Sequence, residues 1–533
     1  MKRILTILFT LACFSSCEDV EQPMTRDFTE SSFWRDSQDA LDALTSCYEN
    51  MYSGDYFFAN EALSDNAYNK SNSFEGVGQI ASGGYDARTP RVSNEWGYHY
   101  TCIRKCNVVL ENVDRISGAS EELVNRIKAE ARFIRAFSLF HLTTWYGDVP
   151  LVTKVLSLTE AKEFPRSTHA EVTEYVLSEL NDIQQFLPTS YPDTDRGRIT
   201  RAAAIGIRAR VNLYEGKWDA VISDCDKLIH SSDNGFFALH PDYGALFTVA
   251  AEYNREIIFD LQFGGSRLQT NQRLFLPQTV GKLRANLVPT KALVDNYVML
   301  NGKGIDDAGS GYDEDNPYAN RDPRMEHTIL HHGSEIEDFD GVTQTILTEP
   351  GSDPVTNTIE DQGASATGYY FKKYYDPTAV NYNSGVNLIL LRYADVLLMY
   401  AEAMQAKGQF TESVWDETIK PIRNRAGFME TSATTFDAGM NQIALGEVIQ
   451  QERRSEFGFE GLRVFDIRRL KLAEQVLNEP VKGIKVSGQF PKDEDGYLIV
   501  EERVFQNPKH YYWPVPQFEV DQNPNLLPNN EGW

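Results

Sequence analysis

The most restrictive feature of the sequence is a segment from Glu121 to Tyr146 that has helical spacing and apolar residues on nearly every side. Ser120 before it is a typical N-cap residue, and Gly147 follows at the position where a helix often ends with positive φ. A surface helix keeps one polar face, so a helix of this kind has to be enclosed on several sides. The chain must therefore supply further helices that pack around this segment.

Helical periodicity extends over the first half of the chain and returns near its end. Between Thr200 and His230 the pattern is helix, tight turn, helix, with small and apolar residues spaced as in a tetratricopeptide repeat of about 34 residues. One such unit cannot bury its own apolar face, so stacked partners are expected, with an ordinary helical hairpin as the alternative. Helices are predicted at 37–51, 95–113, 121–146, 169–186, 200–214, 218–230, 390–407 and 443–454.

The middle third of the chain has a different composition. Residues 232–385 are rich in Gly, Asn, Asp, Tyr and Pro, with strand-like runs at 256–261 and 369–372, and long irregular connections usually carry function. Acidic runs at 306–307 and 313–316 offer calcium ligands, but neither matches a twelve-residue calcium loop, which favours solvated loops. We expect a mainly α fold with tetratricopeptide-like helical pairs as scaffold, long irregular loops and a few short strands. The expected divisions are 1–16, 17–231, 232–385 and 386–533, the last three forming one globular unit.

The N-terminus is typical of an export signal that ends in a lipidated cysteine. Two basic residues precede an apolar run at 4–14, and two serines then precede Cys17, an order that resembles a bacterial lipobox. Cys13 is a weaker competing site, and a secretory signal without lipid is the remaining alternative. Acyl chains at Cys17 would hold the protein on a membrane, because each buried methylene contributes about 0.8 kcal/mol.

Charge and motif content exclude several classes of function. The chain carries 51 Lys and Arg against 77 Asp and Glu, a formal net charge of −26, which repels nucleic acids. It contains no GxSxG elbow, HExxH motif, phosphate loop or dinucleotide-binding glycine pattern. His99, Cys102 and Cys106 have a spacing that suits three zinc ligands on one helix face, but no fourth ligand is near, and core packing is the simpler interpretation. We expect no cofactor, no catalytic residue and no bound metal.

Three long blocks in the C-terminal third carry the most specific signal. They are NLILLRYADVLLMYAE at 387–402, ERRSEFGFEGLRVFD at 452–466 followed by IRR, and WPVP at 513–516 with QNPNL at 522–526. These blocks resemble the SusD/RagB family, the substrate-binding lipoproteins of Bacteroidetes nutrient-uptake systems. In the N-terminal half, 103–107 and 129–150 are also similar to the family. Because the blocks occur in the right order from the lipobox to the C-terminus, the resemblance implies a SusD-like fold.

The signature blocks themselves are expected to be scaffold. Arg392, Asp395 and Glu402 lie in an apolar segment, and buried charges persist only when they are paired. A glycoside hydrolase would use two such carboxylates as acid and nucleophile, but nearby arginines keep carboxylates ionised, whereas a general acid needs a raised pKa. The expected partners are Glu452, Arg453, Arg454, Glu456, Arg463 and Asp466.

The resemblance also implies a function. Such a lipoprotein, anchored at Cys17 on the outer face of the outer membrane, captures a nutrient, usually an oligosaccharide, and passes it to a SusC-like TonB-dependent transporter. The acidic residues after Cys17 are similar to the surface-export tag of Bacteroidetes lipoproteins. Peptide capture, which some relatives perform, is the main alternative; a surface glycan hydrolase and a purely structural repeat adaptor are the others.

A sugar-binding site needs aromatic faces for the C–H side of the sugar and polar side chains for its hydroxyls, on loops held by a scaffold. Two regions fit this description. Tyr68, Tyr85 and Phe275 are the preferred candidates because they lie in polar, Gly-rich sequence, whereas Trp96 also suits a core and Asp65 also suits a turn. The predicted contacts are Asp65, Asn66, Tyr68, Phe74, Tyr85, Arg88 and Trp96 in the first region and Phe263, Arg273 and Phe275 in the second.

Overall fold

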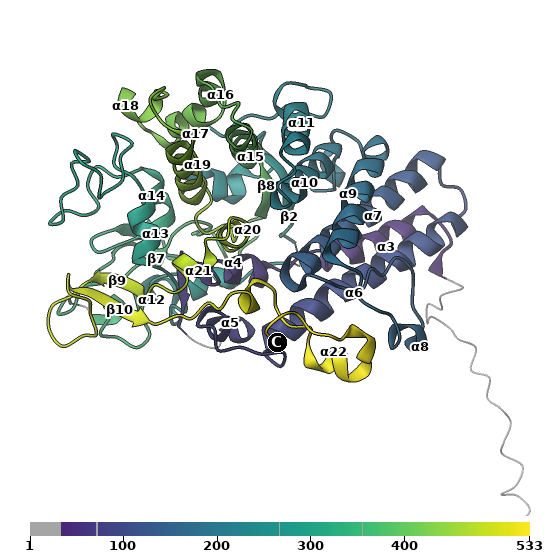
Figure 1. Ribbon diagram of the computed structural model, residues 1–533, viewed down its shortest axis with the longest axis horizontal. Helices are drawn as coiled ribbons and strands as arrows, with labels where there is room; N and C mark the ends of the chain where they lie inside the picture. The colour runs from purple at the N-terminus through teal and green to yellow at the C-terminus, as the bar shows by residue number, and fades with distance from the viewer. Residues whose placement is uncertain (1–32, 71–72, 266, 354) are drawn as a thin grey trace, which may run out of the picture.

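The computed structural model describes residues 33–70, 73–265, 267–353 and 355–533, and helices make up most of the right half and the top of Figure 1. Consecutive helices of a stack contact each other in chain order from α3 to α19. This arrangement confirms the mainly α fold and supplies the stacked partners that the pair α10–α11 needs. The stack comprises α3 (Ser37–Glu49), α6 (Pro90–Asn112), α7 (Glu121–Tyr146), α9 (His169–Asp182), α10 (Arg201–Tyr214), α11 (Trp218–Ile229), α15 (Tyr393–Ala406) and α19 (Gln442–Glu456).

Helix α7 has the two ends that its sequence predicts. The Ser120 hydroxyl accepts a hydrogen bond from the Leu123 amide at 3.2 Å, and Gly147 ends the helix with φ 67°. Helices α3, α6, α9 and α10 contact α7, so its apolar surface is enclosed as expected. At its C-terminal end Trp145 stacks on Trp513, with ring centroids 4.2 Å apart, and this contact joins the N-terminal helices to the closing family block.

One predicted helix is partly wrong. The segment 390–407 begins as strand β8 (Leu388–Arg392), and α15 starts only at Tyr393. A short, fully apolar run suits a buried strand as well as a helix, and here pairing with β2 (Ile257–Leu261) decides the outcome. Helix α6 also starts earlier than predicted, at Pro90, a residue that favours the first turn of a helix.

The remaining strands form antiparallel pairs that brace the loops, mainly on the left of Figure 1. The pairs are β1 (Ala67–Asn69) with β3 (Leu287–Pro289), β4 (Ile329–Leu330) with β7 (Tyr370–Phe371), β5 (Glu335–Glu337) with β6 (Thr343–Thr345), and β9 (Val481–Lys485) with β10 (Tyr497–Glu501). Shorter helices lie between them, including α4 (Gly54–Ala62), α5 (Ser73–Ala81), α13 (Lys291–Asn296) and α22 (Gln517–Gln522).

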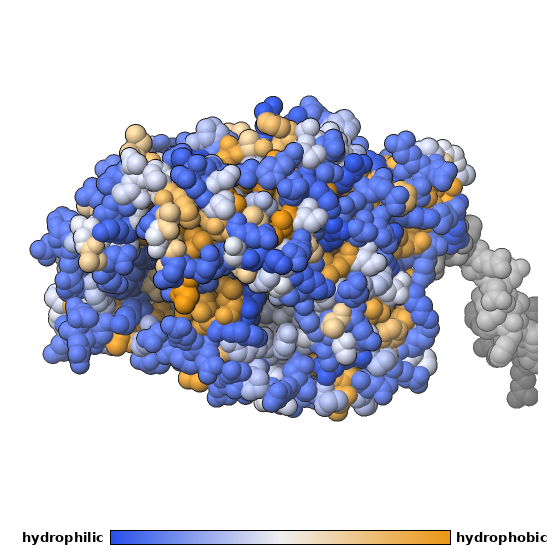
Figure 2. Space-filling model, turned by 45° about the horizontal axis from the view of Figure 1, so that its top comes forward, coloured by the Kyte–Doolittle hydropathy of each residue, from blue (hydrophilic) through white to orange (hydrophobic). Residues whose placement is uncertain are grey.

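One hydrophobic core connects all the regions, because a single cluster of buried residues extends from Trp34 to Leu526. The face shown in Figure 2 is mostly hydrophilic, with apolar side chains in patches, the broadest in a hollow left of the centre. Within the part of the chain that the structure describes, no helix has the length and apolar character needed to cross a bilayer. The predicted signal and Cys17 lie outside the described residues.

Candidate functional site

The polar residues at the start of the first predicted region belong to the scaffold. The Asp65 carboxylate forms ion pairs with Arg454 at 3.0 Å and Arg463 at 2.9 Å. Burial raises the pKa of Asp65, but the two guanidinium charges outweigh burial and hold that pKa well below its usual range. The fully buried Asn66 amide donates to Glu61 at 2.6 Å and accepts from Arg454 at 2.7 Å. Their polar groups are already used, so we correct the prediction that Asp65 and Asn66 contact a ligand.

Three of the predicted rings are core residues. Tyr85 is 5% exposed and packs on Trp533, with centroids 4.8 Å apart. Phe275 is fully buried, and its ring lies 4.8 Å from that of Phe459. Trp96 is 3% exposed, in agreement with its alternative interpretation as a core residue. The polar sequence around Tyr85 and Phe275 suggested exposure, but C-terminal segments cover both rings, so these two leave the candidate site. Trp96 still lines a separate cavity of about 690 Å³ with Tyr100 and Phe518.

The other three residues of the first region keep accessible surface. Tyr68 is half-buried on β1, and Phe74 is half-buried at φ 54° in the distorted start of α5. Arg88 is exposed in the turn that precedes α6. They remain candidate contacts.

The second predicted region keeps Phe263, Arg267 and Arg273 partly accessible, whereas Gln269, Asn271 and Gln272 are buried. The described residues of its segment 262–273, which are 262–265 and 267–273, are held by the turn 384–387 that leads into β8. The Phe263 amide donates to the Asn387 side chain at 2.7 Å, and Gln269 exchanges backbone hydrogen bonds of 2.9 and 2.8 Å with Ser384. Phe263 and Arg273, near the two ends of the segment, are both half-buried. The backbone is therefore fixed at Phe263 and Gln269, while the side chains of Phe263 and Arg273 can meet a ligand.

A cavity of about 200 Å³ adjoins the first end of this segment; we call it the Arg267 cavity. The Tyr253 hydroxyl donates to the Gln262 side chain at 2.7 Å, and the Arg267 guanidinium lies 5.2 Å from the Phe263 ring centroid. Gly197 has φ 87°, and a Cβ there would lie 2.3 Å from Gln262, so the close approach of the two walls requires glycine. The cavity is lined by Thr45, Tyr48, Met51, Thr194, Asp195, Arg196, Gly197, Arg198, Asp260, Leu261, Gln262 and Arg267.

Asp260 is the most perturbed acid of this cavity. Burial raises the pKa of Asp260 to about 7, against the effect of hydrogen bonds from Gln262 and Asn387. Its side chain is almost fully buried, and each of its oxygens accepts from one of those amides. The carboxyl group therefore orients Gln262 and Asn387 at the site.

At the other end of the segment, the Arg273 guanidinium lies beside three aromatic rings; we call Arg273, Phe339, Tyr375 and Tyr382 the Tyr382 cluster. Arg273 stacks on Tyr382 at 4.1 Å, and the Phe339 ring meets Tyr382 edge-on at 4.9 Å and Tyr375 at 5.3 Å. All four side chains are half-buried. The Gln272 amide donates to the Tyr382 carbonyl at 3.3 Å and thereby fixes the turn that carries this ring.

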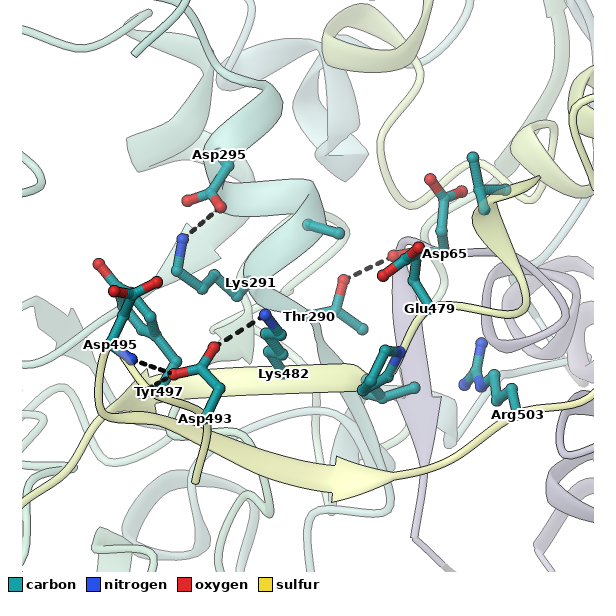
Figure 3. Close-up of a pocket in the computed structure, with 14 residues that line it drawn as sticks. Asp65, Thr290, Lys291, Asp295, Glu479, Lys482, Asp493, Asp495, Tyr497 and Arg503 are labelled. Carbon is teal, nitrogen blue, oxygen red and sulfur yellow. Dashed lines mark hydrogen bonds and ion pairs between the residues drawn. The ribbon is translucent and has the colours of Figure 1, made fainter. Parts of the chain in front are cut away.

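A third group of side chains surrounds a charged pocket of about 280 Å³, the Lys291 pocket (Figure 3). Lys291 pairs with Asp295 on α13, and Lys482 pairs with Asp493 at 2.8 Å across the β9–β10 hairpin. The Lys291 ammonium also lies 4.1 Å from the centroid of Tyr497, the aromatic ring in this pocket. A sugar that stacked on Tyr497 would have to displace the Lys291 ammonium from that ring, and its hydroxyls would compete with the two ion pairs. The Lys291 pocket therefore suits a glycan less well than the segment 262–273.

Sequence reasoning did not single out Tyr382 and Arg267, which the structure adds as candidate contacts. Arg267 lies inside the second predicted region but was not singled out, and Tyr382 belongs to the polar turn Asn381–Ser384, whose composition was the available signal. Only the fold shows that this turn lies beside Gln272.

The residues considered as metal ligands serve the scaffold. His99 is buried and stacks on His141 at 5.4 Å, and Cys102 and Cys106 are buried on the same helix. Asp313 accepts hydrogen bonds from Asp315 and Asn316 in its own turn. Across the described ranges, no group of three or more His, Cys, Asp or Glu side chains could hold a metal ion.

Known proteins resemble this chain over nearly its whole length. SusD-like protein P25 of Formosa agariphila is 25% identical over 98% of this chain and 97% of the relative, and a SusD-like protein of Bacteroides ovatus is 24% identical over 98% and 97%. A SusD-like carbohydrate-binding protein of Bacteroides fragilis has 27% identity and a TM-score of 0.83, covering 93% of this chain and all of that one. A laminarin-binding SusD-like protein, 20% identical, has the same fold with a TM-score of 0.71 over 94% of this chain and 100% of that one.

Family models match both halves of the chain. Residues 18–213 match a family described as starch-binding and associating with the outer membrane. Residues 250–533 match the model of the SusD family, which is more than half of the chain. The chain therefore belongs to the SusD family.

Proposed function

We propose that the protein is a cell-surface lipoprotein that binds an oligosaccharide along the segment 262–273 and delivers it to a SusC-like TonB-dependent transporter. The observation that carries the proposal is that this one segment joins the Arg267 cavity to the Tyr382 cluster. Half-buried rings can stack on sugar faces, and the Gln262 amide and the guanidinium groups beside them can bind hydroxyls. The carbohydrate-binding and laminarin-binding relatives support the same ligand class.

The proposal treats the protein as a binding protein without turnover. Two carboxylic acids line the Arg267 cavity, and Asp195 is held in an ion pair with Arg198 at 3.0 Å. Asp260 has a raised pKa, but its oxygens accept hydrogen bonds from Gln262 and Asn387 and its side chain is buried, so it is poorly placed to protonate a glycosidic oxygen. Incubation with polysaccharides should release no new reducing ends; their appearance with purified protein, and their loss in Asp260→Asn, would establish a hydrolase.

Isothermal titration against a panel of polysaccharides, oligosaccharides and peptides tests the ligand class. The mature chain with Cys17→Ser, which lacks the lipid, is the protein to use. We expect at least one glycan to bind and Tyr382→Ala to weaken that binding about tenfold, which corresponds to about 1.4 kcal/mol, the energy typical of a lost aromatic stacking contact. Phe236→Ala, after α11, is the control, because this ring is 64% exposed and lies outside both the segment 262–273 and the Arg267 cavity. Binding of peptides alone would establish peptide capture instead.

Delivery requires a complex with the transporter. Affinity purification of the tagged, acylated protein from outer membranes should recover a TonB-dependent transporter in stoichiometric amount. Recovery of the protein alone under conditions that preserve other membrane complexes would contradict this part of the proposal.

A further inference from the structure

We infer that the oligosaccharide carries a negatively charged group, a carboxylate or a sulfate ester, which Arg267 binds in the cavity. This inference rests on the proposed function and specifies the ligand class. It starts from the three arginines that line the Arg267 cavity. Arg198 is neutralised by Glu130 at 3.2 Å and Asp195 at 3.0 Å, and Arg196 is paired with Asp193 at 2.6 Å. Arg267 has no carboxylate within ion-pair distance among the residues that the structure describes.

The Arg267 guanidinium also makes few hydrogen bonds. It has five N–H donors, and one of them reaches the Glu49 carbonyl at the long distance of 3.4 Å. The side chain is nevertheless half-buried, so it has lost part of its hydration. A neutral sugar hydroxyl could accept one of these hydrogen bonds, but it would leave the charge uncompensated. A carboxylate or sulfate accepts two parallel hydrogen bonds from the planar fork and neutralises the charge at the same time.

Aromatic rings hold this cation and its neighbour in place. The Arg267 guanidinium lies 5.2 Å from the centroid of Phe263, and that of Arg196 lies 5.6 Å from the centroid of Tyr253. A cation that lies over a ring face keeps its edge free for an anion. The two carboxyl groups of the cavity compete little for Arg267, since Asp195 is bound by Arg198 and Asp260 by the amides of Gln262 and Asn387.

The overall charge of the protein does not exclude an anionic ligand. The net charge of −26 repels anions at long range, but at 0.15 M salt that repulsion is screened over about 8 Å. An ion pair in contact with Arg267 lies well within that distance and is partly shielded from salt by the cavity walls. Binding experiments at this ionic strength therefore report the local contact.

The test compares ligands that differ only in charge. Isothermal titration of the mature Cys17→Ser chain uses oligogalacturonates against their methyl esters for the carboxylate arm, and sulfated galactan oligosaccharides against their desulfated forms for the sulfate arm. We expect the charged member of one pair to bind at least about tenfold more tightly than its neutral counterpart. Arg267→Gln should abolish that difference, and Arg267→Lys should restore part of it, because a point charge replaces the bidentate fork.

Arg115→Gln is the matched control, since Arg115 is exposed in the short turn of helix that follows α6 and does not line the cavity. Unchanged tryptophan fluorescence and unfolding midpoints would show that all variants keep the fold. If a neutral glycan binds as tightly as any charged one and Arg267→Gln leaves its affinity unchanged, the inference is wrong and the proposed function stands. If no glycan binds and acidic peptides do, both the inference and the proposed function are wrong.

Discussion

Replacement of Arg392 by methionine should destabilise the protein severely, because this side chain is the centre of a buried ion network. It is 1% exposed and donates hydrogen bonds to the carboxylates of Glu256 at 2.8 Å, Glu456 at 2.5 Å and Glu460 at 2.7 Å. Further hydrogen bonds reach the second oxygen of Glu460 and the Glu456 carbonyl. Burial disfavours the charged form, but the carboxylates outweigh burial and raise the pKa of Arg392 well above its ordinary value.

The size of the effect depends on the charges that remain. Without Arg392, Glu456 still pairs with Arg324 at 2.9 Å, and Glu460 still pairs with Lys373 at 2.6 Å. Each of these two carboxylates therefore keeps a positively charged partner. Removal of one partner from a buried ion pair costs about 3–5 kcal/mol. Methionine fills most of the vacated volume and adds little cavity cost. A loss of this size is at least a fifth of the total stability of about 5–15 kcal/mol that is typical of folded proteins.

Urea unfolding followed by tryptophan fluorescence at pH 7 measures the difference. The control is Arg88→Met, an exposed position where a change within about 0.5 kcal/mol is expected. The double variant Arg392→Met/Glu460→Gln should recover part of the loss, because it also removes one buried negative charge. If Arg392→Met loses less than about 1 kcal/mol, the network contributes no more than surface ion pairs do, and the electrostatic account of the scaffold is refuted.

Changes elsewhere test the scaffold, the core and the anchor separately. The pKa of Asp65 is depressed well below its usual range in the folded state, so its ion pairs contribute fully above about pH 4 and their contribution declines as the pH falls from there toward the depressed folded pKa; Asp65→Asn should therefore lower the urea midpoint at pH 7 and lower it by less at pH 3. Phe275→Ala should cost about 3–5 kcal/mol in the same assay, and wild-type stability would place this ring outside the core. Cys17→Ser should abolish palmitate labelling and move the protein out of the membrane fraction, where its retention would contradict a lipid anchor at this residue.

The sequence predicts the position of an element correctly when the signals for its ends are local. Ser120 and Gly147 mark both ends of α7 because caps depend on residues within one turn. The burial of Arg392 and its pairing with Glu456 also follow from the sequence, since a charge inside an apolar run needs a partner. Other pairings were missed: Glu402 pairs with Arg469, outside the expected set, because partner choice depends on side-chain geometry across elements.

Exposure of rings was the least predictable property. Tyr85 and Tyr382 both lie in polar sequence with neighbouring turn residues, yet Tyr85 is covered by Trp533 and Tyr382 stays half-buried beside Arg273. Which ring is covered depends on where a distant chain segment lies, and no local pattern contains that information. The same limit explains why Phe275 was a preferred contact and proved to be core.

The scaffold and the candidate site meet at one short strand, β8, and in the proposed function this connection allows the signature block to position a site that it does not line. Immediately before the strand, the Asn387 side chain binds the Phe263 amide and Asp260; at the end of the strand, Arg392 enters the ion network. The network fixes β8, and the turn that leads into β8 holds the backbone at Phe263 and Gln269. The side chains of that segment can then change with the ligand without loss of the charges that hold the fold. A strongly constrained strand beside an adaptable segment is the arrangement that a binding protein needs to keep its scaffold and vary its substrate.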